Sequence, residues 1–205
     1  MGKNNTNNST RERLVDSARE LFWAKGYEAT SVADILDKAE VNSGSLYHFF
    51  GGKEDLLLAV VDRYREFLWP NVFSAAYEDM EDPIERIFGV LAQYREALAS
   101  NGCTRGCPIG NLALEVSDSH PAARAKLAEN FEDWRLWVRR CLEEAGGRIP
   151  LDTNLDALAT LVLTTMEGGV MQARVHKDLS LFDQSIAQLR DYFERLLGVA
   201  TPTSA

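Results

Sequence analysis

The sequence predicts an all-α protein with about nine helices, and three observations lead to this fold class. Apolar residues recur three and four positions apart along almost every segment, as they do on one face of a helix. No segment shows the alternating pattern of a half-buried strand, and no internal repeat is present. Proline stands in first turns and glycine just past last turns, where helices tolerate them.

The first two expected helices follow from an apolar stripe and from suitable caps. The stripe over residues 10–25 consists of Leu14, Val15, Ala18, Leu21 and Phe22, and Gly26 ends that helix. A short second helix is expected over residues 32–39, because Thr30 and Ser31 are good N-caps and Asp34 stands in a capping-box position.

A third helix of about two turns is expected over residues 43–50, with Asn42 as its N-cap. Leu46 and Phe50 stand at i and i+4, so they are its natural buried pair. The opposite side is left with Ser43, Gly44, Tyr47 and His48.

A fourth helix is expected from Lys53 to Pro70, after Gly51 and Gly52 have ended the third, and it reads as a connector between two bodies. Five more helices are expected over residues 83–100, 109–118, 121–145, 155–176 and 181–197. The domains expected from this order are residues 8–68 and residues 69–200.

Composition fits a globular protein, since 45% of the 205 residues are hydrophobic and 26% are charged. No stretch resembles a secretory signal or a membrane span, so a cytoplasmic location and no membrane partner are expected. Three cysteines, an odd number, argue against a disulfide framework. The net charge of -9 argues against strong non-specific binding to nucleic acid.

A capped short helix, a tight turn and a second short helix form the plan of a helix-turn-helix, whose second helix enters the DNA major groove. Residues 10–61 read "TRERLVDSARELFWAKGYEATSVADILDKAEVNSGSLYHFFGGKEDLLLAVV". This stretch resembles the N-terminal, three-helix DNA-binding domain of the tetracycline-repressor (TetR) family of transcriptional regulators. The resemblance implies that DNA is contacted by Thr30, Ser31, Ser43, Gly44, Ser45, Tyr47, His48 and Lys53.

Within this resemblance Tyr47 and Lys53 would hold phosphates, whereas Ser43 would face bases. The alternative for Tyr47 is a ring that is merely packed. The sequence departs from the family pattern at Glu40, where the turn usually has glycine, at Phe49, and at the glycine pair before Lys53. These departures leave the operator sequence and the affinity open.

The second body resembles one branch of the same family's effector domains through "GCPIGNLALEVSDSHPAARAKLAENFEDW", residues 106–134. The resemblance implies a helical domain that binds a small inducer and forms a homodimer through its last two helices. The apolar faces for that dimer are Leu158, Leu161, Val162, Thr165, Gly169, Ala173, Ile186, Leu189, Phe193, Leu196 and Leu197. An intramolecular core is the alternative for these faces.

Candidate effector-binding residues are aromatic, sulfur-containing or acidic side chains on the expected helices. They are Phe88, Tyr94, Cys107, Leu112, Glu115, Trp134, Trp137, Met166, Glu167, Met171 and His176. For each of them, plain core packing is the alternative. As a set they suggest an apolar or aromatic effector.

Cys103 and Cys107 stand in a loop that runs into a helix, with Arg105 between them. Both features activate a thiol, so sensing of an electrophile or oxidant is a hypothesis, and a packed, inert cysteine is the alternative. Metal binding is a poor fit, because the pair has no third cysteine or histidine nearby.

The function expected from these patterns is a homodimeric repressor, released from a palindromic DNA operator by a small apolar or electrophilic effector. No catalytic residues, metal or cofactor are expected, because the chain lacks H-E-x-x-H and G-x-S-x-G and its "GGKE" is not a phosphate-binding loop. Two other classes stay open: an enzyme of unrecognised type, and a helical protein-protein adaptor without DNA binding.

Overall fold

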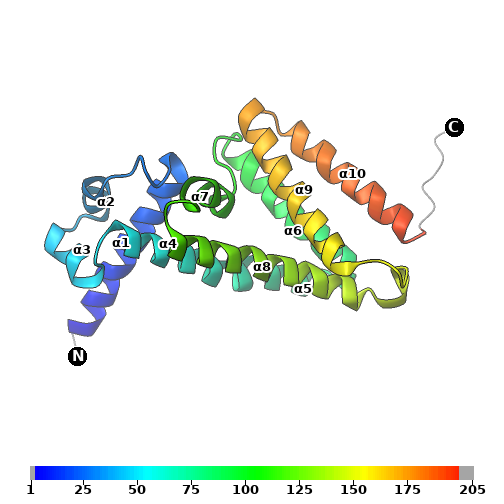
Figure 1. Ribbon diagram of the computed structural model, residues 1–205, viewed down its shortest axis with the longest axis horizontal. Coiled ribbons are helices and arrows are strands. Elements are labelled where there is room, and N and C mark those ends of the chain that lie inside the picture. The colour runs from blue at the N-terminus through cyan, green and yellow to red at the C-terminus, as the bar shows by residue number, and fades with distance from the viewer. Residues whose placement is uncertain (1–2, 199–205) are drawn as a thin grey trace. The chain divides into compact units, whose positions relative to one another are not determined.

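The computed structural model describes the backbone of residues 3–198 and the side chains of residues 9–67, 71–74, 76, 78 and 80–198. Every regular element in this part of the chain is helical (Figure 1), so the predicted all-α class is confirmed. The α-helices are α1 Lys3–Lys25, α2 Val32–Ala39, α3 Ser43–Phe49, α4 Lys53–Leu68, α5 Ser74–Asp79, α6 Pro83–Ser100, α7 Pro108–Val116, α8 Pro121–Glu144, α9 Leu155–His176 and α10 Ser180–Leu196. None of these described helices is long and apolar enough to cross a membrane.

Most helix ends lie within two residues of the predicted ones, and α6 and α9 coincide with their predictions. The main exception is α1, which begins at Lys3, seven residues before the predicted start at Thr10. Those seven residues include Asn, Thr and Ser but no apolar residue, so hydrophobic periodicity cannot detect them.

The segment between α4 and α6, for which the sequence predicts no helix, is helical as far as Asp79. The backbone passes from α4 into one turn of π-helix, Trp69–Phe73, and then into α5. Pro70 lies in this π-turn. A proline lacks the N–H of a regular α-helix and interrupts its ladder, and a π-turn accommodates such an interruption without ending the helix.

The chain forms two compact units, and they do not divide at a single point in the sequence. The first unit contains the residues up to Phe67 together with Pro108–Asn130, and the second contains Leu68–Cys107 and the residues from Phe131 onward. Helix α7 and the start of α8 therefore cluster with the N-terminal helices, although the prediction placed them in the domain 69–200. Residues 199 and 200 of that domain lie outside the described residues.

The first unit is built around the apolar stripe of α1. Its fully buried side chains include Leu14, Ala18, Ile35, Leu46 and Leu57. Helices α2 and α3 both pack against α1, and Figure 1 shows these three helices together. Each short helix has a side-chain cap: Ser31 accepts the backbone N–H of Asp34 on α2, and Asn42 accepts that of Ser45 on α3.

The turn between α2 and α3 contains a strained residue. Glu40 follows α2 with φ 54° and ψ 46°, a left-handed conformation that glycine adopts without a steric cost. Its backbone N–H donates to the carbonyls of Leu36 and Asp37, so the turn is hydrogen-bonded despite the strain. This geometry explains why a glycine suits the position.

Replacing Glu40 with glycine is expected to stabilise the protein by about 0.5–1 kcal/mol, because the strain relieved exceeds the extra entropy lost by glycine. The measurement is the midpoint of thermal unfolding, which should rise by a few degrees. Asp37→Gly is the matched control, because Asp37 lies inside α2 and a glycine there should destabilise by about 1 kcal/mol. A lower midpoint for Glu40→Gly would contradict the prediction.

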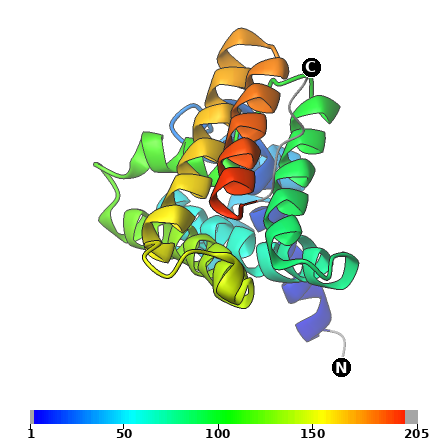
Figure 2. The same ribbon diagram turned by 90° about the vertical axis from the view of Figure 1, so that its right-hand side faces the viewer.

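In the second unit, α6, α9 and α10 pack against one another (Figure 2). Gly169 on α9 allows a close approach, since a Cβ there would lie 3.0 Å from the ring of Phe182 on α10. Two ion pairs join α6 to α10: Arg95 holds Asp183 at 2.7 Å, and Arg190 holds Glu85 at 2.7 Å. Gly169 is therefore required for the close packing of α9 against Phe182 of α10.

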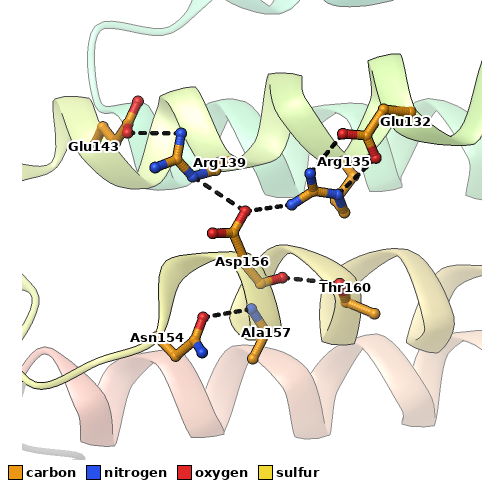
Figure 3. Close-up of polar contacts among 8 residues, drawn as sticks. All are labelled: Glu132, Arg135, Arg139, Glu143, Asn154, Asp156, Ala157 and Thr160. Carbon is orange, nitrogen blue, oxygen red and sulfur yellow. Dashed lines mark hydrogen bonds and ion pairs between the residues drawn. The ribbon is translucent and has the colours of Figure 1, made fainter.

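A surface ion network joins the second half of α8 to the start of α9 (Figure 3). Asp156, in the first turn of α9, pairs with both Arg135 and Arg139 of α8, at 3.2 Å in the second case. Arg135 also holds Glu132 at 2.6 Å, and this hydrogen bond lowers the pKa of Glu132. Exposed ion pairs such as these add little stability.

Candidate functional site

Helix α3 presents a polar face to solvent, as the sequence predicts. Ser43, Gly44, Tyr47 and His48 are exposed, and Tyr47 is 62% exposed. On the other face Leu46 is fully buried, and Phe50, which follows the helix, is also buried. An exposed tyrosine hydroxyl beside a helix N-terminus can bind a phosphate group, because both supply hydrogen-bond donors.

Lys53, the first residue of α4, lies over an aromatic ring. Its Nζ is 4.0 Å from the ring centroid of Tyr27, which follows α1. Tyr27 is buried between two further rings, at 5.2 Å from Phe22 and 5.0 Å from His120. The contact holds the ammonium group in place without neutralising it, so the charge stays available to an anion.

The turn that carries Tyr27 is held by a carboxylate 88 positions away in the sequence. Glu115 of α7 accepts the backbone N–H of Tyr27 at 2.9 Å and that of Glu28 at 2.8 Å. Gly26, with φ 93°, is required here because a Cβ would lie 2.9 Å from a Glu115 oxygen. We call this set, Gly26, Tyr27, Glu28 and Glu115, the α1–α7 clamp.

In the second unit, four aromatic rings form one connected group. Tyr94 on α6 lies 5.7 Å from Trp134 on α8, and Trp134 lies 6.2 Å from Trp137. Phe73 stacks on Trp137 at 4.8 Å and meets Trp134 edge-on at 5.4 Å. We call Phe73, Tyr94, Trp134 and Trp137 the ring cluster.

Two polar side chains adjoin the ring cluster. The Cys107 thiol hydrogen-bonds the Glu167 carboxyl group, and burial raises the pKa of Glu167. Tyr94 is partly exposed, but its hydroxyl lies deep in the unit and accepts a hydrogen bond from Trp134. Burial first, and then electrostatic interaction with Cys107 and Glu167, raise the pKa of Tyr94.

Comparison with known proteins identifies the chain. The profile of the "Bacterial regulatory proteins, tetR family" matches residues 14–60, and that of the "Tetracyclin repressor-like, C-terminal domain" matches residues 83–189. The chain belongs to the TetR family. It is a DNA-binding transcriptional regulator and not an enzyme.

Similar proteins of this family cover nearly the whole chain. An HTH-type transcriptional regulator of Mycobacterium tuberculosis is 33% identical over 88% of this chain and 92% of its own length. The HTH-type transcriptional repressor DhaR of Mycobacterium sp. is 28% identical over 91% and 92%. A TetR transcriptional regulator from Chloroflexus aurantiacus, solved as a crystal structure, is 29% identical over 93% and 97%, with a TM-score of 0.82.

In this TetR family member, some of the side chains that were predicted to contact DNA instead form hydrogen bonds inside the protein. Thr30 is fully buried, and its hydroxyl donates to the carbonyl of Gly26 at 2.6 Å, so it serves the turn and is not available to a phosphate. Ser31 is exposed, but its N–H and hydroxyl are engaged with Asp34. Ser45 is half-buried, and its hydroxyl donates to Asn42 at 3.2 Å.

Asp34, three residues after Ser31, is the acid that hydrogen-bonds the cap of α2. Hydrogen bonds from Lys25 and Ser31 lower its pKa to about 2. It therefore stays charged at neutral pH beside the start of α2. A negative charge there disfavours a phosphate at the start of α2.

Only part of the predicted effector set lies at the ring cluster. Tyr94, Cys107, Trp134, Trp137 and Glu167 are brought together, and sequence reasoning missed Phe73 because its segment carries no periodic pattern. Leu112 and Glu115 belong to the first unit, Phe88 packs under Arg190 and against Phe193, and Met171 and His176 are exposed. Met166 is buried next to Glu167 in sequence.

None of the three cysteines forms a disulfide, and all three are buried. Cys107 is 6% exposed, so a reagent has little access to it in this conformation. No group of three His, Cys, Asp or Glu side chains in the described part of the chain could hold a metal ion.

Helix α9 leaves one apolar stripe uncovered. Its members recur at alternating steps of four and three residues, and they are Ala157, Leu161, Thr164, Gly168, Met171 and Val175. Leu161, Met171 and Val175 are 42%, 51% and 73% exposed. This period, 3.5 residues, is that of a helix seam packed against another helix. We call these six residues the α9 stripe.

The apolar faces predicted for the dimer are mostly used inside the protomer. Leu158, Val162, Gly169, Ala173, Leu189 and Phe193 are buried where α9 meets α10. The alternative of an intramolecular core is therefore right for these residues. In contrast, a Cβ added at Gly168 of the α9 stripe would meet nothing within 4 Å.

The α1–α7 clamp gives a direct prediction. Glu115→Gln is expected to destabilise the protein by about 1–2 kcal/mol, because one of the two turn N–H groups would face an amide donor instead of an oxygen. DNA affinity should fall as well, since the turn that carries Tyr27 positions Lys53. The measurements are thermal unfolding and titration of a DNA duplex that the regulator binds.

The control for Glu115→Gln is Glu143→Gln, which breaks an exposed ion pair with Arg139 on α8. Its effect on stability should stay within about 0.5 kcal/mol. Equal effects from the two variants would show that the clamp has no special role.

Proposed function

We propose that this TetR family regulator is a cytoplasmic homodimeric repressor, released from a palindromic operator when a small effector enters the second unit. The exposed polar face of α3 carries the proposal, because packing within the described first unit does not explain why this two-turn helix leaves a tyrosine exposed. The "GCPIGNLALE" stretch, Gly106 to Glu115, would place it in one branch of the family's effector domains.

Two copies are needed for this function. TetR family regulators act as dimers, and a palindrome is read by two recognition helices in successive major grooves, about 34–36 Å apart. The α9 stripe is our proposed seam of the dimer, together with the exposed side of α10, where Tyr192 is 45% exposed. Four helices, two from each copy, would then form a bundle.

Effector binding would reach the DNA through α7. Cys107 at the ring cluster immediately precedes Pro108, the first residue of α7, and the same helix carries Glu115 of the clamp. A shift of α7 therefore acts on the turn that positions Tyr27 and Lys53. A coupling free energy of about 1–3 kcal/mol would change operator affinity about 5- to 150-fold.

An electrophilic effector is the second form of the proposal, and it depends on Cys107. Cys107→Ser should then abolish release of DNA by aldehydes, quinones or peroxide. Unchanged release would leave a reversibly bound, non-covalent effector as the proposal.

The proposed function is tested by selecting bound duplexes from a random pool with the purified full chain. We expect an inverted repeat whose half-sites are about one helical turn, or a multiple of it, apart. A mobility-shift titration then gives the stoichiometry of two chains per site. Enrichment of a single half-site bound by one chain would refute the dimeric repressor.

A further inference from the structure

Glu167 has a feature that effector control alone does not explain. Its Oε1 atom is buried, and no hydrogen-bond donor in the described part of the chain reaches it. The Cys107 thiol bonds the same carboxyl group, so the group is held in place while one oxygen is left over. A buried acceptor without a partner is unfavourable, and a ligand donor would recover that loss.

Glu167 has aromatic rings in its surroundings but, in the part of the chain that the structure describes, no basic side chain that would balance its negative charge. Among the described residues, no lysine or arginine forms an ion pair with Glu167. Tyr94, whose hydroxyl lies close to this carboxyl group, opens the ring cluster that continues through Trp134, Trp137 and Phe73. Aromatic ring faces attract a cation, and the attraction is strongest away from water.

These features select one kind of ligand. An anion would meet the carboxyl group and the negative faces of the rings, and a hydrocarbon would leave Oε1 without a donor. A positively charged N–H group satisfies Oε1 and is attracted by the rings, while an aromatic body can stack among them.

We propose that Glu167 and the ring cluster form a recognition site for a protonated organic amine with an aromatic body, which donates an N–H to Glu167 Oε1. This inference rests on the proposed function, since it names the effector class of that regulator. Glu167 would supply the specificity for charge, and the four rings would supply most of the contact area.

The test uses the full chain and a matched pair of probes. 2-Phenylethylamine is protonated at neutral pH, and propylbenzene has nearly the same shape without the charge. Binding is followed by quenching of tryptophan fluorescence and by thermal shift, in the absence of DNA. The amine should bind about tenfold more tightly or better, and equal binding of the two probes, or no binding of the amine, would overturn the proposal.

A third probe separates the two ways in which Glu167 could act. The ketone 4-phenylbutan-2-one accepts a hydrogen bond, so it would be preferred if Glu167 were a protonated donor. Binding of the ketone as tight as that of the amine would overturn the assignment to a cation. Weak ketone binding supports it.

Glu167→Gln keeps the shape of the side chain and removes its charge. We expect amine binding to fall about tenfold or more while propylbenzene binding is unchanged. Glu96→Gln, an exposed position on α6, is the control and should bind both probes as the natural chain does. Unchanged amine binding in Glu167→Gln would refute the site, and the probe comparison on the natural chain decides if that variant does not fold.

Operator release is measured separately, so that the two proposals can fail independently. Amine binding that depends on Glu167 but leaves operator affinity unchanged supports the site and refutes the effector-controlled release. Release by another compound that is equal in Glu167→Gln and the natural chain, with no amine binding, supports the proposed function and refutes the site.

Discussion

Gly168→Gln is expected to weaken the dimer about 30- to 10⁴-fold while each chain keeps its fold. Gly168 lies in the middle of the α9 stripe, where an added Cβ meets nothing in its own chain. A seam with glycine at its centre allows close helix approach, and a long side chain would separate the two helices. Overpacking costs about 1–3 kcal/mol per site, and a two-fold interface contains the site twice.

Sedimentation equilibrium measures the dissociation of Gly168→Gln directly, and operator binding should fall with it. Met171→Glu tests the same seam by burying a charge, and it should act in the same direction. Gly147→Gln is the matched control, since Gly147 also has nothing near its Cβ but lies outside the α9 stripe. An undiminished dimer in both stripe variants would exclude this face of α9 as the interface.

Tyr47→Phe is expected to weaken operator binding about 30- to 150-fold, and by nearly the same factor on every operator sequence. The change removes one hydrogen bond to a phosphate in each half-site, worth about 1–1.5 kcal/mol each. Because Tyr47 is 62% exposed, the loss of its hydroxyl should not affect folding. Tyr192→Phe on α10 is the control, and it should leave DNA affinity unchanged.

Lys53→Ala separates charge from hydrogen bonding at the same DNA face. Removing one phosphate contact per half-site should reduce the slope of log affinity against log salt by about 0.9 per contact, which Tyr47→Phe should not do. Changes at Ser43, by contrast, should alter which sequences are preferred. A variant of Tyr47 or Lys53 that changes sequence preference would contradict their assignment to phosphates.

Features set by neighbouring residues could be predicted from the sequence. The caps Ser31 and Asn42 and the buried residue Leu46 depend on residues within one or two turns, and all three are found as expected. The start of α6 has Pro83 in its first turn, and the start of α9 has Asn154 as its cap. Local hydrogen bonding and periodicity decide such features, so one sequence is enough.

Features set by distant residues could not be predicted. Glu115 reads as part of an amphipathic helix, and nothing near it indicates that it bonds Tyr27 and Glu28. Thr30 reads as an exposed N-cap, yet its hydroxyl turns back to Gly26. Periodicity also predicted an apolar face on α9, but not which part of it its own α10 covers. That choice depends on packing between helices.

The distance between Glu115 and the turn it holds has a consequence for how the protein is made. A ribosome releases the segment up to Phe67 long before it adds α7, so the DNA-reading unit stays incomplete until more than half of the chain has been synthesised. A truncated product that ends after α4 lacks both the carboxylate and the α9 stripe. Such fragments would neither hold their turn nor pair, so abortive translation would not yield competitors for the operator.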